Sequence, residues 1–406
     1  MRAVKILLLA ALAWLASSTQ LSAQNGESVE IAREHTVSSA ILGEERPVQV
    51  ALPVGYDTTE AYPVVYVLDG PAHLVHTTGS ARFLAENGRM PAAIVVAIAN
   101  TPGNRTRDLA PPPGNDDPGD ATGDASKFRA FLRDELKPWV ESRYSTRRYD
   151  VLIGHSLGGL FISHVLNTEP ELFDAYVSIS PALGWADEEF VAEMDDLFER
   201  FPAARGALYM TMGNEGGATL SGAWHLAGTL EKSAPASFRW HWKRMPTETH
   251  ESVPARGTYD GVEWIFSGWY PIDLMADLAR RGASELPRLG NHYAGLSAEF
   301  GWEIAPPLNE LVNTVYQMVE SDRDDDALAI ATQTAEWFPD DAYARSGIGL
   351  AHVGACRWSE AEKHYGRALE MAEAGEGYGW LADFLRGELR RIREKASSDE
   401  SCVPAA

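Results

Sequence analysis

Short continuous apolar runs alternate with stretches of helical periodicity over roughly the first two thirds of the chain. Continuous runs bounded by turn residues are typical of strands that are buried on both faces of a parallel sheet. The runs predict strands at residues 48–52, 63–68, 92–98, 149–153, 206–212 and 238–245. Helical spacing predicts helices at residues 127–144, 160–167 and 259–269. Pro138 should kink or locally re-pair the first of them, because proline has no N–H group. We therefore expect an α/β fold with a doubly wound, mostly parallel sheet.

The pattern becomes helical toward the C-terminus. We expect residues 24–275 to form the α/β domain, residues 276–305 a polar connecting segment and residues 306–395 a small all-α helical-repeat region. In this region four residues fall at positions typical of the tetratricopeptide repeat, whose period is about 34 residues: Gly349, Ala361, Tyr365 and Ala368. A weaker copy lies one period earlier, and an ordinary helical extension is the alternative. Residues 396–406 are expected to form a disordered tail.

Residues 1–23 have the layout of a secretory signal peptide. Arg2 and Lys5 precede an apolar run at residues 6–16, and a small-residue stretch ends at Leu21-Ser22-Ala23. The run is too short to remain as a membrane span, so we expect an exported protein, periplasmic or secreted. Export would permit a disulfide between Cys356 and Cys402.

Composition excludes several classes of function. Lys and Arg number 35 against 58 Asp and Glu, and the net charge of −23 repels phosphate backbones, so no nucleic-acid partner is expected. Two cysteines are too few for a thiolate zinc site or an iron–sulfur cluster, and no His-Glu-x-x-His occurs. We therefore expect no metal and no cofactor. The acidic stretch at residues 115–124 lacks the spacing of a calcium loop and is interpreted as a flexible lid.

Gly154-x-Ser156-x-Gly158 is the pattern of a nucleophile elbow, a strained turn between a strand and a helix that exposes a serine hydroxyl at the edge of a sheet. The two glycines are needed where a Cβ atom would collide with the neighbouring helix and strand. A predicted strand precedes the pattern and a predicted helix follows it. This context indicates an α/β-hydrolase fold with Ser156 as nucleophile, and a structural Gly-Ser-Gly turn is the alternative.

A serine nucleophile needs a base, and in this fold the chain order is serine, acid, histidine. That order leaves His250 best placed, in the loop after the last predicted strand, with His225 and His292 as runners-up. The acid that orients the imidazole should follow the penultimate strand, where Glu215 is the candidate. Glu248, two residues before His250, is the alternative.

Two backbone N–H groups should stabilise the oxyanion. Leu157, directly after the serine, supplies the first. The loop after an earlier strand should supply the second, but Pro71 in that loop has no N–H, so Gly70 and Ala72 are the candidates, with a side chain as the alternative.

These residues resemble the putative-esterase family of α/β hydrolases, which includes siderophore esterases of the enterobactin and salmochelin type and mycobacterial mycolyl transferases. The likeness covers about residues 34–270, and the pieces that carry it are Tyr66-Val67-Leu68-Asp69-Gly70, residues 104–109, residues 154–159, Ser180-Pro181 and residues 248–253. The resemblance implies Ser156 as nucleophile, His250 as base and Glu215 as acid, although some siderophore-cleaving relatives work with a Ser/His dyad. Pro71 departs from the mycolyl transferases, which have an N–H donor at that place.

Arg105 and Arg107 lie beside the expected mouth of the site and could bind an anionic or catecholate-bearing acyl group through charge-assisted hydrogen bonds. Loop salt bridges to Asp108 and nearby acids are the alternative. His155, next to the nucleophile, is a third candidate for substrate contact.

We expect a secreted serine esterase, a carboxylic ester hydrolase that forms an acyl-enzyme on a small-molecule ester. By resemblance, a siderophore or similar lactone is the leading substrate class. A feruloyl or acetyl esterase and an acyltransferase of the same fold are alternatives. A catalytically idle scaffold that binds a partner through its helical repeats is an alternative of another class, and the helical region could also mediate self-association.

Overall fold

The computed structural model describes residues 29–112, 123–375 and 378–397. The predicted signal peptide, most of the predicted lid, nearly all of the predicted tail and Cys402 lie outside these residues, so those interpretations stay predictions.

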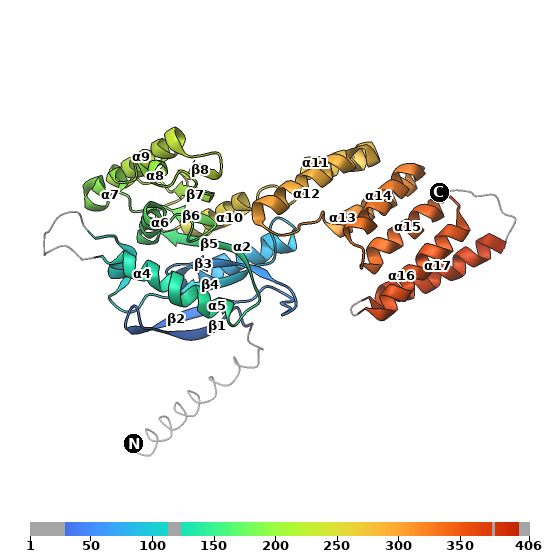
Figure 1. The fold of residues 1–406 in the computed structure, drawn as a ribbon, viewed down its shortest axis with the longest axis horizontal. Coiled ribbons are helices and arrows are strands. Elements are labelled where there is room, and N and C mark those ends of the chain that lie inside the picture. Colours follow the sequence, from blue (N-terminus) through green and yellow to red (C-terminus); the bar gives the residue numbers. More distant parts are fainter. Residues whose placement is uncertain (1–28, 113–122, 376–377, 398–406) are drawn as a thin grey trace, which may run out of the picture.

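An eight-stranded sheet forms the centre of the α/β part, with the strand order β1-β2-β4-β3-β5-β6-β7-β8 (Figure 1). β1 and β2 form an antiparallel hairpin at one edge and β2 pairs antiparallel with β4, whereas all neighbours from β4 to β8 are parallel. The strands are β1 (Arg33–Ser39), β2 (Glu44–Ala51), β3 (Tyr62–Val67), β4 (Ile94–Ile98), β5 (Thr146–His155), β6 (Ala175–Ile179), β7 (Gly206–Met212) and β8 (Phe238–Arg244). This is the mostly parallel α/β sheet that the apolar runs predict.

Helices cover both faces of the sheet. One face packs against α4 (Ala125–Phe131), η1 (Leu132–Leu136), α5 (Lys137–Glu141), α6 (Leu157–Thr168), α7 (Glu189–Ala192), α8 (Leu197–Arg200) and α9 (Gly217–Ser233). The other packs against α2 (Gly70–Glu86) and α10 (Val253–Ile265). Along β3 and the residue after it, Tyr66 and Leu68 belong to the first core while Val65 and Val67 belong to the second, as the alternation of side chains in a strand requires. Two layers of apolar side chains therefore fix the sheet.

The helix predicted at residues 127–144 is locally re-paired before Pro138. α4 passes into η1, a π-helical turn, and the chain returns to α-helix in α5, where Pro138 lies in the first turn. Proline cannot donate the usual hydrogen bond, and a π-turn accommodates the missing donor without ending the helix.

Among the described residues of the C-terminal third, the regular elements are all helices. It contains α11 (Ile272–Arg281), η3 (Gly282–Glu285), α12 (Leu286–Phe300), α13 (Leu308–Glu320), α14 (Asp324–Trp337), α15 (Ala342–Gly354), α16 (Trp358–Ala374) and α17 (Gly379–Ser397). The segment at residues 276–305, expected to be a polar connection, is thus largely helix. Figure 1 shows these helices extending to one side of the sheet. The core of the α2 and α10 face continues through α11 to α15, which joins the two parts.

Close packing of α15 on α16 depends on a small residue. A Cβ atom at Gly349 would lie 2.3 Å from the ring of Tyr365, and Ala361 and Ala368 are buried in the same interface. Small residues at these positions are what the repeat pattern predicts, but the assignment to the tetratricopeptide class stays a prediction.

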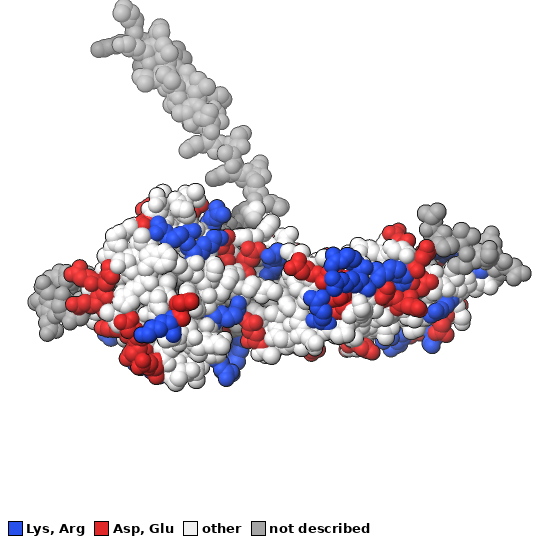
Figure 2. Space-filling view, turned by 90° about the horizontal axis from the view of Figure 1, so that it is seen from above, with Lys and Arg blue, Asp and Glu red and all other residues white. Residues whose placement is uncertain are grey.

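Charges of both signs are spread over the surface. Figure 2 shows basic side chains gathered beside acidic ones over the helical part. In this part Asp277 and Glu285 pair with three arginines, Arg280, Arg281 and Arg288. Within the described ranges no helix combines the length and the hydropathy needed to cross a bilayer.

Candidate active site

The candidate residues gather at one edge of the sheet because parallel strands end there together. His155 is the last residue of β5, Gly213 and Glu215 follow β7, and His250 follows β8. Ligand and catalytic groups of open α/β sheets lie at the carboxyl ends of the strands. The topology therefore brings residues nearly a hundred positions apart to one place.

Ser156 lies at the turn between β5 and α6 in a strained conformation, with φ 59° and ψ −115°. A positive φ is rare for a residue with a side chain and is typical of functional turns. The turn is fixed on both sides, since the Ser156 N–H donates to Ile179 O and its carbonyl accepts from Leu160 N and Ala182 N. This is the geometry of a nucleophile elbow.

Gly154 and Gly158 were both expected to exclude a Cβ atom, but the structure shows such crowding at Gly154 and Gly159. A Cβ atom at Gly154 would lie 2.4 Å from the carbonyl oxygen of Gly158, so a side chain is excluded there. At Gly158 itself the nearest atoms would be side-chain atoms of Leu68 at 3.5 Å, an ordinary contact. The second crowded position is Gly159, where a Cβ atom would lie 2.8 Å from Cα of Pro181. The requirement predicted for Gly158 thus belongs to Gly159.

Glu215 and His250 lie directly against each other. Glu215 Oε2 is 2.9 Å from His250 Nδ1, and the two side chains are 17% and 35% exposed. A carboxylate at Nδ1 holds the imidazole with its other nitrogen available as a base. Glu248, the alternative, points elsewhere: it accepts from Ser252 Oγ at 2.7 Å and lies 3.8 Å from Arg256 Nη1.

Ser180 completes this arrangement and was not identified as a site residue from the sequence. It is fully buried, its Oγ donates to Glu215 Oε1 at 2.5 Å, and the same oxygen accepts from Gly213 N at 3.2 Å. Like Ser156, it has a positive φ, 42°. The Ser180-Pro181 pair was a signal in the sequence, but only as part of the family resemblance.

His155 links the elbow to His250. The two imidazole rings lie 4.4 Å apart between centroids. Among the described residues no hydrogen bond joins Ser156 Oγ to His250, so the structure brings the two residues into one neighbourhood without that bond. Catalytic hydrogen bonds are often long before substrate binds.

A row of imidazoles continues away from His250. His155 contacts His73 at 5.6 Å and His73 contacts His76 at 5.2 Å between ring centroids. Burial, and next the nearby His250 and His73, lower the pKa of His155 to about 4. Burial, and next His73, lower the pKa of His76 to about 4. The neighbour of His250 is therefore neutral near pH 7 and does not repel a protonated His250.

The two candidates for the second oxyanion donor differ. The Ala72 N–H donates to Asp69 O at 2.9 Å inside the first turn of α2, so this donor already has an acceptor, which favours Gly70 over Ala72. Gly70 is the first residue of α2, where N–H groups have no partner within the helix. Leu157 has the same position in α6, directly after Ser156. Leu157 and Gly70 remain as backbone candidates.

Arg105 reaches the elbow through an ion pair with Asp69. Its Nε and Nη2 donate to the two carboxylate oxygens at 2.7 and 2.9 Å, and Nη2 lies 3.5 Å from His155 O. Burial alone would raise the pKa of Asp69, but Arg105 and Asn100 overcome it and the pKa is lowered. The Arg105 side chain is 37% exposed, so part of the cation faces solvent beside the nucleophile.

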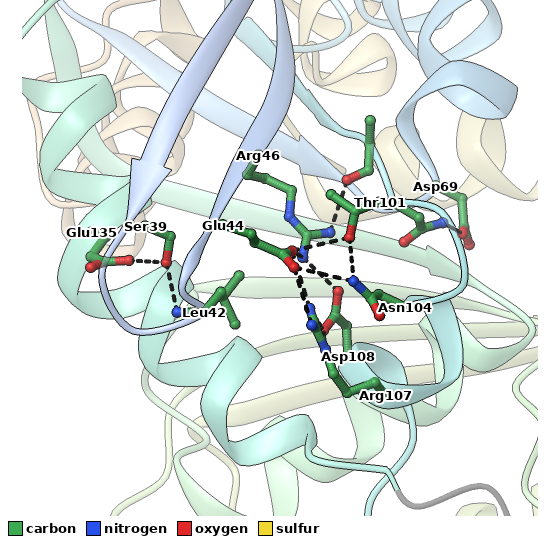
Figure 3. Close-up of polar contacts among 12 residues, drawn as sticks. Ser39, Leu42, Glu44, Arg46, Asp69, Thr101, Asn104, Arg107, Asp108 and Glu135 are labelled. Carbon is green, nitrogen blue, oxygen red and sulfur yellow. Dashed lines mark hydrogen bonds and ion pairs between the residues drawn. The ribbon is translucent and has the colours of Figure 1, made fainter.

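Arg107 lies in a different environment, the network drawn in Figure 3. Its guanidinium donates to Glu44 at 3.1 Å and to Asp108 at 2.7 Å, which is the salt-bridge alternative of the sequence analysis. Arg46, whose side chain is fully buried, donates to Asp108 Oδ2 at 2.6 Å and also pairs with Glu44. The network fastens α3 (Arg105–Leu109) to β2, and thereby positions Arg105. The structure does not bring Arg107 to the elbow.

Similarity to known proteins shows the family of this chain. Residues 39–251, more than half of the chain, match the family model described as Putative esterase. The chain belongs to the putative esterase family. The match includes the elbow, Glu215 and His250.

Two curated relatives of this esterase-family chain are siderophore esterases by name. The chain is 31% identical over 157 residues to the siderophore triacetylfusarinine C esterase of Aspergillus fumigatus, covering 35% of this chain and 53% of the relative. It is 32% identical over 156 residues to the ferri-bacillibactin esterase BesA of Bacillus subtilis, covering 34% of this chain and 53% of the relative. The chain thus spans about half the length of the curated relatives it matches.

A solved relative extends the likeness. The crystal structure of an IroE-like serine hydrolase from Shewanella oneidensis superposes with a TM-score of 0.60 at 28% identity and covers 79% of this chain and 99% of that chain. The α/β-hydrolase architecture of this esterase-family chain, predicted from its sequence, is confirmed.

Proposed function

We propose that this chain is an exported serine esterase that cleaves carboxylic esters of the siderophore type through Ser156, His250 and Glu215. The observation that carries the proposal is the 2.9 Å contact of Glu215 Oε2 with His250 Nδ1, at the sheet edge where Ser156 occupies a strained elbow. A nucleophile, a base and an orienting acid at one edge are what acyl transfer requires.

In the first half of the reaction, His250 removes the Ser156 proton as the hydroxyl oxygen attacks the ester carbonyl. Glu215 stabilises the imidazolium that forms. The oxyanion accepts hydrogen bonds from the Leu157 N–H and a second donor, for which Gly70 is the candidate. His250 then gives the proton to the leaving alcohol. Water, activated by the same imidazole, releases the acyl group and regenerates Ser156.

The substrate class is supported by the names of the two relatives and by one local feature. Arg105 offers a partly exposed guanidinium next to the nucleophile. Such a group can bind the oxygens of a catecholate or another anionic acyl group. His155, whose backbone oxygen lies 3.5 Å from Arg105 Nη2, is the second candidate for substrate contact.

The test is a hydrolysis screen of the purified chain with short aryl esters, feruloyl esters and ferric siderophore lactones. Ser156→Ala and His250→Ala should remove most turnover while the fold, followed by circular dichroism, is retained. Glu215→Gln should cost less than either. Glu248→Gln is the matched control and should change little. Equal and modest losses for the first three variants would contradict the assigned roles.

Other activities of the same edge give different outcomes. Ester products formed in the presence of an added alcohol would indicate an acyltransferase, and preference for feruloyl or acetyl esters would indicate an esterase of another substrate class. A chain whose Ser156 does not react with a fluorophosphonate at a pH where His250 is neutral would favour the scaffold function, with binding through the helical part.

Export is the remaining part of the proposal and rests on residues 1–23. Expression of the chain with and without these residues, followed by cell fractionation, tests it. Equal retention of both forms inside the cell would contradict export.

A further inference from the structure

Three side chains suited to a metal ion meet between α15 and α16. They are His352, Glu360 and His364, and one ligand atom of each lies within 4.8 Å of the others. His352 is in the last turn of α15, while Glu360 and His364 are four residues apart on α16 and so share one face of that helix. The cluster belongs to the helical part, away from the sheet edge that holds Ser156 (Figure 1).

His352 is buried but incompletely paired. Its side chain is 8% exposed, and its Nδ1 atom has no hydrogen-bond partner among the described residues. Its ring stacks on that of His364, with centroids 5.4 Å apart and an interplanar angle of 24°. Buried polar atoms are normally satisfied, so the Nδ1 atom of His352 calls for a further partner.

We propose that His352, Glu360 and His364 form a binding site for a late first-row divalent cation such as Zn²⁺. Two imidazole nitrogens and one carboxylate oxygen are a donor set that Zn²⁺ prefers, with water as the fourth ligand. Bonds of about 2.0–2.1 Å place two ligands of a tetrahedron about 3.3 Å apart, so the side chains must approach by up to ~1.5 Å. Glu360 is exposed and His364 is half-buried, which leaves both room to reorient.

Neighbouring cations oppose the ion and limit its affinity. Lys363 Nζ lies 3.3 Å from Glu360 Oε2, and a bound metal would have to replace it there. Arg345 and Arg357 also act electrostatically on this pair of histidines. The site is therefore expected to bind Zn²⁺ less tightly than a site without neighbouring cations. The bound ion would link α15 to α16.

From the sequence no metal is expected, because two cysteines are too few for a thiolate site and no His-Glu-x-x-His pattern occurs. Here the ligands are divided between two helices, and only their antiparallel packing brings His352 to the face that carries Glu360 and His364. The spacing of the three residues along the chain therefore does not by itself indicate a metal site.

The experiment is calorimetric titration of the metal-free full chain with ZnCl2. We expect one Zn²⁺ per chain, and a dissociation constant at least tenfold weaker in His364→Gln and in Glu360→Gln. His225→Gln, which removes an imidazole from α9, is the control and should bind as the unaltered chain does. Zn²⁺ should also raise the midpoint of thermal unfolding of the unaltered chain, and raise it less in His364→Gln.

Co²⁺ provides an independent readout of coordination. Visible d–d absorption of the Co²⁺-loaded chain should be lost in His364→Gln. His352→Gln should lose it as well, and the half-buried His364 keeps the test decisive if the buried variant fails to fold. Absence of Zn²⁺ binding by the unaltered chain would overturn the proposal. So would binding that persists undiminished in His364→Gln and Glu360→Gln, or that is abolished only by His155→Gln, since the ion would then lie among the imidazoles of the candidate active site.

Discussion

Ser180 Oγ donates a hydrogen bond of 2.5 Å to Glu215 Oε1, while the other carboxylate oxygen of Glu215 faces His250 Nδ1 at 2.9 Å. The buried serine therefore fixes the carboxylate that fixes the base. Because Ser180 follows β6 and Glu215 follows β7, the relationship also ties two neighbouring strand ends together.

Removal of this hydroxyl should weaken catalysis without abolishing it. In Ser180→Ala, Glu215 loses one charge-assisted hydrogen bond, and the Gly213 N–H loses its acceptor. A bond of this kind contributes roughly 1.5 kcal/mol or more, so we expect kcat to fall about tenfold, with a smaller change in KM. Steady-state kinetics on an aryl ester measures both.

Ser163→Ala is the matched control. Its hydroxyl is also buried and donates to Gly159 O at 3.2 Å within α6, but it does not contact Glu215. If both alanine variants lower kcat equally, the effect comes from general loosening of the core and the positioning role of Ser180 is wrong.

A second prediction concerns the buried ion network of Figure 3. Arg46 is fully buried between Asp108, Glu44 and the rings of Phe128 and Phe131, whereas the Arg107 side chain is 34% exposed. Removal of one partner of a buried pair leaves an uncompensated charge, so Arg46→Met should lower the free energy of unfolding by about 3–5 kcal/mol.

Arg107→Gln should cost about 1 kcal/mol or less, because a partly exposed ion pair is screened by solvent. Urea unfolding of both variants compares the two losses. Equal losses would mean that the network does not depend on the buried cation. If Arg107→Gln also lowers kcat/KM for an anionic ester, the network positions Arg105 as the structure suggests.

The elbow glycines give a third prediction. A Cβ atom at Gly159 would lie 2.8 Å from the backbone of Pro181, so Gly159→Ala should destabilise the chain by about 1–3 kcal/mol. Gly79, in the middle of α2, has no atom within 4 Å of a Cβ position, and Gly79→Ala should stabilise the chain by about 0.5–1 kcal/mol. Thermal unfolding measures the two shifts. Shifts of the same sign would show that crowding at Gly159 is not the cause.

The sequence predicts best those features that depend on local pattern. The range 206–212 coincides with β7, and the elbow string lies between β5 and α6 as its context indicates. β1 and β6 are missing from the predicted strands. β1 is an edge strand with four exposed residues and no apolar run, and the short apolar run of β6 is interrupted by Ser178. Edge strands and short strands are stabilised by their neighbours more than by their own pattern.

Features that depend on tertiary contacts could not be predicted. From its sequence, Arg46 would be expected at the surface, because arginine is rarely buried without a partner and its buried partner Asp108 lies 62 positions away along the chain. The choice between Glu215 and Glu248 depends on where the loops after β7 and β8 lie in space. That the Ala72 N–H already donates to Asp69 O depends on the turn at Asp69, which the sequence does not specify.

The last prediction concerns the dependence of stability on pH. His164, on α6, is 6% exposed, and burial, and next the charge of Arg129, lower its pKa from 6.5 to about 4. Between these two pH values the unfolded chain binds a proton at this histidine and the folded chain does not. The free energy of unfolding therefore rises with pH in this window, and acidification from 6.5 to 4 removes up to about 3 kcal/mol through this group. In His164→Gln the slope between pH 6.5 and 4 should fall by about 1.4 kcal/mol per pH unit. Ser126→Ala is the control. It removes the hydroxyl 3.4 Å from His164 Nε2 but keeps the imidazole, so the pH dependence of its free energy of unfolding should match that of the unaltered chain.

Urea unfolding at several pH values gives these slopes. An unchanged slope in His164→Gln would show that this histidine is protonated in the folded chain.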